Sequence, residues 1–113
     1  MDEAQQAVLI VMTNAPDRAT AEKIGRALVD ARVAACINVM SPCTSVYRWR
    51  GAVETAEEVP LFIKTTVSRY AAVEELIRKL HPYELPEIVA VPAGHGLPGY
   101  LAWVRAETTP GAA

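Results

Sequence analysis

The chain has 113 residues, half of them apolar, and a formal net charge of −2, which indicates one small domain. The slightly acidic balance disfavours nucleic-acid binding, because that depends on a clustered basic surface. Cys36 and Cys43 are the only cysteines, and their spacing fits neither a disulfide framework nor a CxxC metal site. No apolar run approaches the roughly 18 residues of a membrane span, and the start MDEAQQ lacks the pattern of a signal peptide. These features predict a soluble, cytoplasmic protein without a membrane partner.

The first half of the chain predicts a strand, a helix and a second strand. Residues 8–12 are a continuous apolar, β-branched run, and the turn residues 14–17 that follow can pass into a helix N-cap. From residue 18 to about 32, apolar side chains recur at helical spacing. Residues 34–49 then predict one long extended strand that is bent at Pro42.

The second half predicts a hairpin partner, a second long helix and a fourth strand. Residues 58–65 read as a strand paired with the preceding one, and Pro60 within it predicts a bulge or an unpaired edge because proline has no N–H. Ser68 is expected to cap the second helix, which Pro82 ends. Residues 88–91 predict the last strand.

A short helix over residues 100–105 is expected to close the fold. The ends of the chain are expected to fray and the tail from residue 108 onward to be disordered, so the single domain, residues 1–113, has a folded core over about 8–107. The order βαββαβ plus α predicts an α+β fold, a ferredoxin-like sandwich with both long helices on one face of an antiparallel sheet.

Three of the predicted strands are apolar on both faces, whereas two helices cover only one face of a sheet. The C-terminal helix can cover part of the other face. A large exposed apolar surface usually marks an interaction site, so the sequence predicts an obligate homo-oligomer.

His81 lies between the second helix and Pro82, and its position allows two interpretations. An imidazole at this place can be a metal ligand or a proton-transfer group. It can equally cap the last carbonyl groups of the helix. A metal site would need further ligands from elsewhere in the chain or from a second subunit.

Aromatic residues and a lysine lie on the two paired strands. Tyr47 and Trp49 are two positions apart and project to one face of their strand, while Phe62 and Lys64 share a face of the partner strand. They line a pocket or, alternatively, serve as core or interface anchors. Lys64 needs an anion, a carboxylate or solvent at its tip, because its strand is otherwise apolar.

Short motifs in a fixed order relate the chain to a known family. The motifs are TNAPD, AACIN, SPCTSVYRWRG, IKTT, HPYELPEI and YLAWV. With them the sequence resembles the CutA family of divalent-cation (copper) tolerance proteins from about residue 8 to 104. The resemblance implies a ferredoxin-like compact homotrimer that binds copper and other divalent ions weakly and is not an enzyme.

The resemblance also implies metal ligands, namely a cysteine ahead of the APD turn and two consecutive histidines ahead of PY. Those positions are Thr13, Leu80 and His81 in this chain, so only His81 matches. Cys36 matches a cysteine of the family's AC-x-N segment. The expected metal ligands are His81, the nearby carboxylate of Glu84 and the thiol of Cys36.

Two other functions remain as alternatives. The CutA family is similar in fold and assembly to PII-type trimeric signal proteins, which implies a sensor of a small anionic ligand in clefts between subunits. Tyr47, Trp49, Lys64 and Tyr83 would line such a cleft. Acylphosphatase-type hydrolysis is disfavoured, because the loop TNAPDRAT lacks a glycine and Pro16 lacks an N–H for a phosphate cradle.

Overall fold

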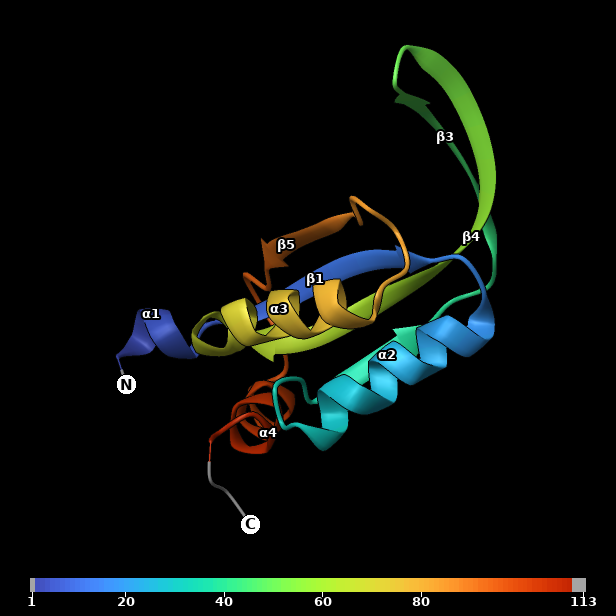
Figure 1. The fold of residues 1–113 in the computed structure, drawn as a ribbon. Helices are drawn as coiled ribbons and strands as arrows, with labels where there is room; N and C mark the ends of the chain where they lie inside the picture. The colour runs from blue at the N-terminus through green and yellow to red at the C-terminus, as the bar shows by residue number, and fades with distance from the viewer. Residues whose placement is uncertain (1, 111–113) are drawn as a thin grey trace.

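The computed structural model describes residues 2–110. The sheet has the strand order β2-β4-β1-β5, every neighbouring pair is antiparallel, and β3 pairs with β4 outside this path. Helices α2 and α3 cover one face of the sheet (Figure 1). This topology confirms the predicted α+β sandwich with an extra C-terminal helix. The elements are α1 (Glu3–Gln6), β1 (Val8–Ala15), α2 (Arg18–Asp30), β2 (Cys36–Val39), β3 (Cys43–Trp49), β4 (Ala52–Thr66), a 3-10 turn (Val67–Arg69), α3 (Tyr70–Leu80), β5 (Ile88–Pro92) and α4 (Pro98–Glu107).

The core lies between the helices and the sheet. Val11 of β1 and Leu61 and Ile63 of β4 are fully buried against Ile24 of α2 and Ile77 of α3. Burying each such side chain contributes about 1.5–3 kcal/mol. The alternating apolar positions of the sequence therefore place the helices over one face of the sheet.

The ends of the two long helices show which of the predicted capping and terminating residues the structure uses. Asp17 caps α2 as expected, since its Oδ1 accepts a hydrogen bond from the Thr20 amide at 2.7 Å. The Ser68 cap prediction is wrong, because Ser68 lies in the 3-10 turn and its hydroxyl contacts the Thr66 hydroxyl at 3.2 Å. Helix α3 ends at Leu80, as the following proline predicted.

The predicted long second strand is divided into β2 and β3. Val39 faces Leu61 and Cys43 faces Glu58, so three residues, 40–42, lie opposite two on β4. The irregularity expected at Pro60 thus lies in the chain facing it. Pro60 itself stays in register with β1.

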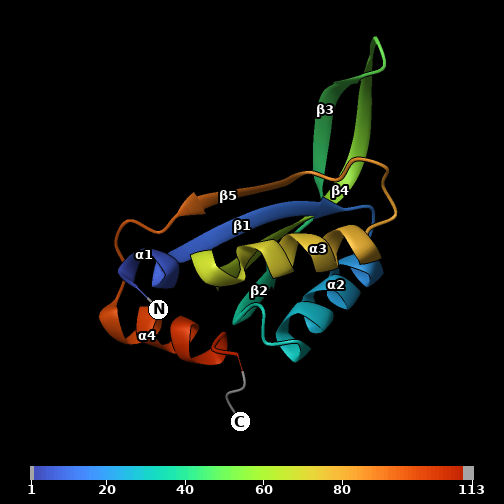
Figure 2. The same ribbon diagram turned by 60° about the vertical axis from the view of Figure 1, so that its left-hand side comes forward.

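Strand β4 begins six residues earlier than predicted and forms, with β3, a hairpin that projects from the body (Figures 1 and 2). We call residues 43–58 the arm. Its two-residue turn, Arg50 and Gly51, has positive φ at both positions, 51° and 84°, which is the type I′ geometry that matches strand twist.

The ends of the described chain are more ordered than predicted. Asp2 caps the short helix α1 through the Gln5 amide. Thr108 is buried and its hydroxyl donates to the Val104 carbonyl at 2.9 Å, so the disorder predicted from residue 108 is wrong there. The same prediction for residues 111–113 lies outside the described residues. Within residues 2–110 no helix is both long and apolar enough to cross a bilayer.

The face of the sheet away from α2 and α3 is only partly covered, and we call it the open face. Helix α4 packs against β4 and β1 at one end of it, where the Tyr100 hydroxyl reaches Cys36. Further along, apolar side chains remain substantially exposed. They include Phe62 of β4 and Val89 and Val91 of β5.

Candidate functional site

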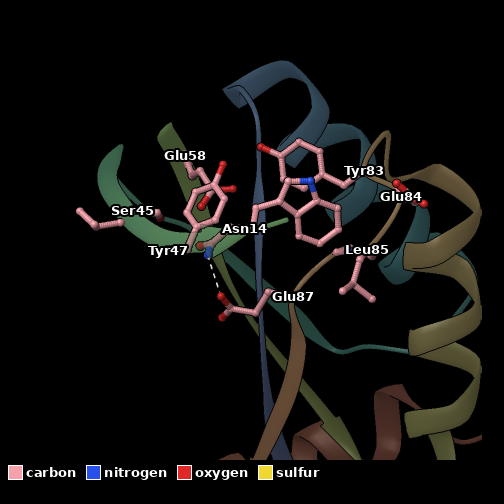
Figure 3. A pocket seen from close by; sticks show the side chains of 11 residues that line it. Asn14, Ser45, Tyr47, Glu58, Tyr83, Glu84, Leu85 and Glu87 are labelled. Atoms are coloured by element: carbon pink, nitrogen blue, oxygen red, sulfur yellow. Dashed lines mark hydrogen bonds between the residues drawn. The ribbon is translucent and has the colours of Figure 1, made fainter. Parts of the chain in front are cut away.

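A cleft of about 730 Å³ lies between the arm and the loop that joins α3 to β5 (Figure 3). Ser45, Tyr47 and Trp49 share one face of β3 by strand alternation, and Glu58 stands on the same face of β4 because it pairs with Cys43. The residues that line the cleft are Asn14, Ser45, Val46, Tyr47, Trp49, Glu58, Tyr83, Glu84, Leu85, Pro86 and Glu87.

Tyr83 lies in a negatively charged part of the cleft. Burial raises its pKa to about 12, with further contributions from its hydrogen bond to the Glu58 carboxylate and from electrostatic repulsion by nearby groups, chiefly the Glu58 carboxylate. Deprotonation would add another negative charge to this surrounding. Tyr83 is therefore a neutral hydrogen-bond donor at physiological pH.

His81 connects the loop to β1. Its Nε2 lies 2.6 Å from the Asn14 carbonyl oxygen, and its Nδ1 lies 3.2 Å from the Tyr83 amide. Because an amide can only donate, Nδ1 accepts and Nε2 carries the proton that is donated to Asn14. The ring is 7% exposed, and neither nitrogen has a free lone pair for a metal in this conformation. His81 does cap α3, because its backbone N–H donates to the Ile77 carbonyl at 2.8 Å. Its imidazole bonds instead to the end of β1.

The three expected metal ligands lie apart. The Glu84 carboxylate forms an exposed ion pair with Arg50, with Nη2 and Oε2 2.6 Å apart. Cys36 lies on β2 at the open face, where the Tyr100 hydroxyl has a raised pKa because of burial first and then its proximity to the thiol. Within residues 2–110 no three His, Cys, Asp or Glu side chains converge as a metal site.

The other two positions implied by the resemblance are part of the core. Thr13 is buried and its hydroxyl has no hydrogen-bond partner, while Leu80 packs against the core cluster. Neither offers a strong metal ligand in this chain.

Three of the four predicted cleft residues, Tyr47, Trp49 and Tyr83, do line the cleft. Lys64 does not, because it lies on the open face and its Nζ donates to the Asn38 side chain. Sequence reasoning missed Glu58 and Glu87. Glu58 was counted as the first residue of a strand, and its position on the aromatic face becomes visible only once β4 is known to extend to residue 52.

Comparisons with known proteins show the family to which the chain belongs. A family model, the CutA1 divalent ion tolerance protein, matches residues 9–107. The divalent-cation tolerance protein CutA of Thermus thermophilus is 41% identical over 99 residues, which covers 88% of this chain and 96% of the relative.

Solved structures agree with the sequence match. The crystal structure of CutA from Xylella fastidiosa superposes with a TM-score of 0.89 at 41% identity, covering 91% of this chain and 99% of that one. A protein of Archaeoglobus fulgidus described as a periplasmic divalent cation tolerance protein CutA has a TM-score of 0.87 at 30% identity, covering 90% and 99%.

The fold and the cleft therefore define a protein of the ferredoxin-like α+β class with a projecting hairpin. The chain belongs to the CutA1 divalent ion tolerance family.

Proposed function

We propose that this chain is a non-enzymatic, cytoplasmic, homotrimeric divalent-cation tolerance protein that binds copper or another divalent cation weakly. The observation that carries the proposal is the family match across residues 9–107. Neither nucleic acid nor a membrane is among the proposed partners. The exposed apolar side chains of the open face support the trimer.

The open face is the surface that assembly would bury. Phe62, Val89 and Val91 are each more than a third exposed there, which is unusual for a contiguous apolar surface in a monomer. By strand alternation Asn14 and Glu87 belong to the same side of the sheet. A second subunit on the open face would therefore lie close to the cleft.

Light scattering after gel filtration tests the assembly. The expected mass is three times the 12.2 kDa of one chain, and Phe62→Glu should reduce it. The matched control is Val29→Glu on the outer side of α2, where a valine of similar exposure is replaced by the same charge. A monodisperse wild-type monomer would contradict the proposal.

Metal binding is proposed to involve Glu84, His81 and Cys36 with ligands from more than one subunit, because these side chains do not converge within one chain. Glu84 is exposed and exchanges its Arg50 partner easily. His81 must release one of its two hydrogen bonds, which agrees with weak binding.

Calorimetric titration with copper, zinc and nickel tests this site. Binding heat is expected for the wild type, and it should fall in His81→Ala and in Glu84→Gln. His95→Ala is the control, since His95 is an exposed loop residue. Equal heats in all four proteins would rule out direct binding at the proposed ligands.

The alternative is a PII-like trimeric sensor of a small anionic ligand held between subunits. The aromatic side chains that line the cleft, Tyr47, Trp49 and Tyr83, favour a ligand with an apolar part. A thermal-shift screen of nucleotides and organic acids tests it, because a ligand at 100 times its Kd stabilises by about 2.7 kcal/mol. Absence of stabilisation by every compound would count against the sensor.

A further inference from the structure

We propose that the cleft between the arm and the α3–β5 loop binds a small organic cation, an ammonium or guanidinium group on an apolar body, with Glu58 as its counter-ion and Tyr47, Trp49 and Tyr83 as its walls. The cleft shares Glu84 with the proposed metal site, but the counter-ion Glu58 and the aromatic walls are not among the proposed metal ligands. The proposal assigns a ligand class of opposite charge to the one that a PII-like sensor would take.

The charge of the lining selects a cation. Three carboxylates, from Glu58, Glu84 and Glu87, line the cleft, and its lining contains no lysine, arginine or histidine. Arg50 at the rim pairs with Glu84 alone, which leaves Glu58 and Glu87 without a cationic partner among the described residues. Asp17 adds its field, since its charge contributes to the raised pKa of Tyr83. An anion would enter against this potential, whereas a cation is attracted by it.

Glu58 is the residue that most needs a cationic partner. It is 8% exposed, and within residues 2–110 it forms no ion pair, because the two pairs there join Arg32 to Glu107 and Arg50 to Glu84. Its hydrogen bond with Tyr83 satisfies only part of the carboxylate. A bound cation would give this carboxylate the counter-ion that residues 2–110 do not supply.

The aromatic walls give the cation a second means of recognition. Cations are attracted to the faces of tryptophan and tyrosine rings. The molecule already shows this at the rim, where the Arg50 guanidinium carbon lies 5.1 Å from the centre of the Trp49 ring and the same side chain pairs with Glu84. A carboxylate and an aromatic ring thus receive a guanidinium together at the edge of the cleft.

The dimensions favour an organic ion over a bare metal ion. The volume of about 730 Å³ lies within the roughly 300–1,000 Å³ of small-molecule sites. Glu58 comes from β4, whereas Glu84 and Glu87 come from the α3–β5 loop and are already engaged by Arg50 and Asn14. A ligand with an apolar body fills the space beside Leu85 and Pro86, which a metal ion cannot do.

Amide NMR titration with three probes of one shape tests the charge preference. The probes are 2-phenylethylamine, the neutral 2-phenylethanol and the anionic 3-phenylpropionate, all in the presence of EDTA so that metal binding does not contribute. The amine is expected to bind and to shift the amides of Tyr47 and Tyr83. Tighter binding of the anion, or equal binding of all three probes, would overturn the proposal.

Paired substitutions on β4 test the role of Glu58. Glu58→Gln is expected to weaken amine binding about tenfold or more, as for the loss of a hydrogen bond to a charged group. Glu57→Gln removes the same charge from the neighbouring exposed position and should leave the Kd unchanged. Equal weakening by both would show a general charge effect and contradict the proposed counter-ion.

A variant on the arm keeps the test valid if Glu58→Gln fails to fold. Tyr47→Leu changes a side chain that is 43% exposed, and it removes the aromatic ring and its hydroxyl while keeping an apolar side chain. It should weaken the amine and leave the circular dichroism spectrum unchanged. Undiminished amine binding by a folded Tyr47→Leu would contradict the aromatic wall.

Discussion

The body and the arm share one strand, β4, yet different interactions hold them in place. In the body, Leu61 and Ile63 are fully buried beneath the helices. In the arm, residues 52–57 are mostly exposed, and β3 is their only strand partner among the described residues. An isolated two-stranded hairpin is marginal in water, so the body is stable by its own packing, while the arm is supported by contacts on its cleft side such as the Arg50–Glu84 ion pair.

The largest expected difference between the two regions comes from truncating one apolar residue in each. Leu61→Ala removes a fully buried side chain and should lower the free energy of unfolding by about 3 kcal/mol. Val53→Ala on the arm, 65% exposed, should change it by less than about 0.5 kcal/mol. Urea unfolding of both variants measures this, and similar losses would show that the arm is packed as tightly as the body.

His81 joins the loop beside the arm to the body, and its removal has the second largest expected effect. His81→Ala leaves the Asn14 carbonyl and the Tyr83 amide without their partner, which should cost about 1–3 kcal/mol. Hydrogen exchange at the Tyr83 amide should accelerate more than exchange at the core amide of Ile63. Uniform acceleration would mean that His81 acts on the whole fold.

Two buried threonines in the body give effects of opposite sign. Thr13→Val removes a buried hydroxyl that has no partner and should stabilise by about 1 kcal/mol. Thr65→Val removes a hydroxyl that donates to the Val33 carbonyl at 2.6 Å and should destabilise by a similar amount. Thermal unfolding distinguishes them, and destabilisation by Thr13→Val would reveal a hidden hydrogen bond.

The smallest effect is expected at the exposed contact between the arm tip and the loop. Arg50→Ala removes the ion pair with Glu84, whose side chains are 68% and 73% exposed, so it should cost less than about 1 kcal/mol and less still at high salt. A double-mutant cycle with Glu84→Gln measures the pair. A larger, salt-independent coupling would mean that the arm is fixed to the body.

Sequence predicted the body better than the arm for a physical reason. A helix or strand that buries one side has apolar residues at regular spacing in the sequence. This spacing predicted β1, α2, α3 and β5. Residues 52–57 carry polar side chains on both faces, so they looked like a connection although they continue β4. Pro42 was read as a bend, whereas a bulge opposite Pro60 separates two strands.

The cleft was only half predictable for a related reason. Alternation along one strand placed Tyr47 and Trp49 together, and the HPYE motif drew attention to Tyr83. The other half depends on register, because Glu58 joins the aromatic face only through its pairing with Cys43. Lys64 was assigned to the cleft by its unusual setting, but its amine is satisfied locally by Asn38.

Because β4 runs without interruption from the body into the arm, the length of the arm can change without a change in the body. Val46 and Tyr47 of β3 face Thr55 and Glu54 of β4. At about 3.3 Å per residue, deleting these four residues would shorten the arm by about 7 Å. Because two residues leave each strand, every remaining side chain keeps its face, and the hairpin turn and the body are untouched. Related chains can therefore evolve different spans in steps of two residues without redesigning the domain that carries them.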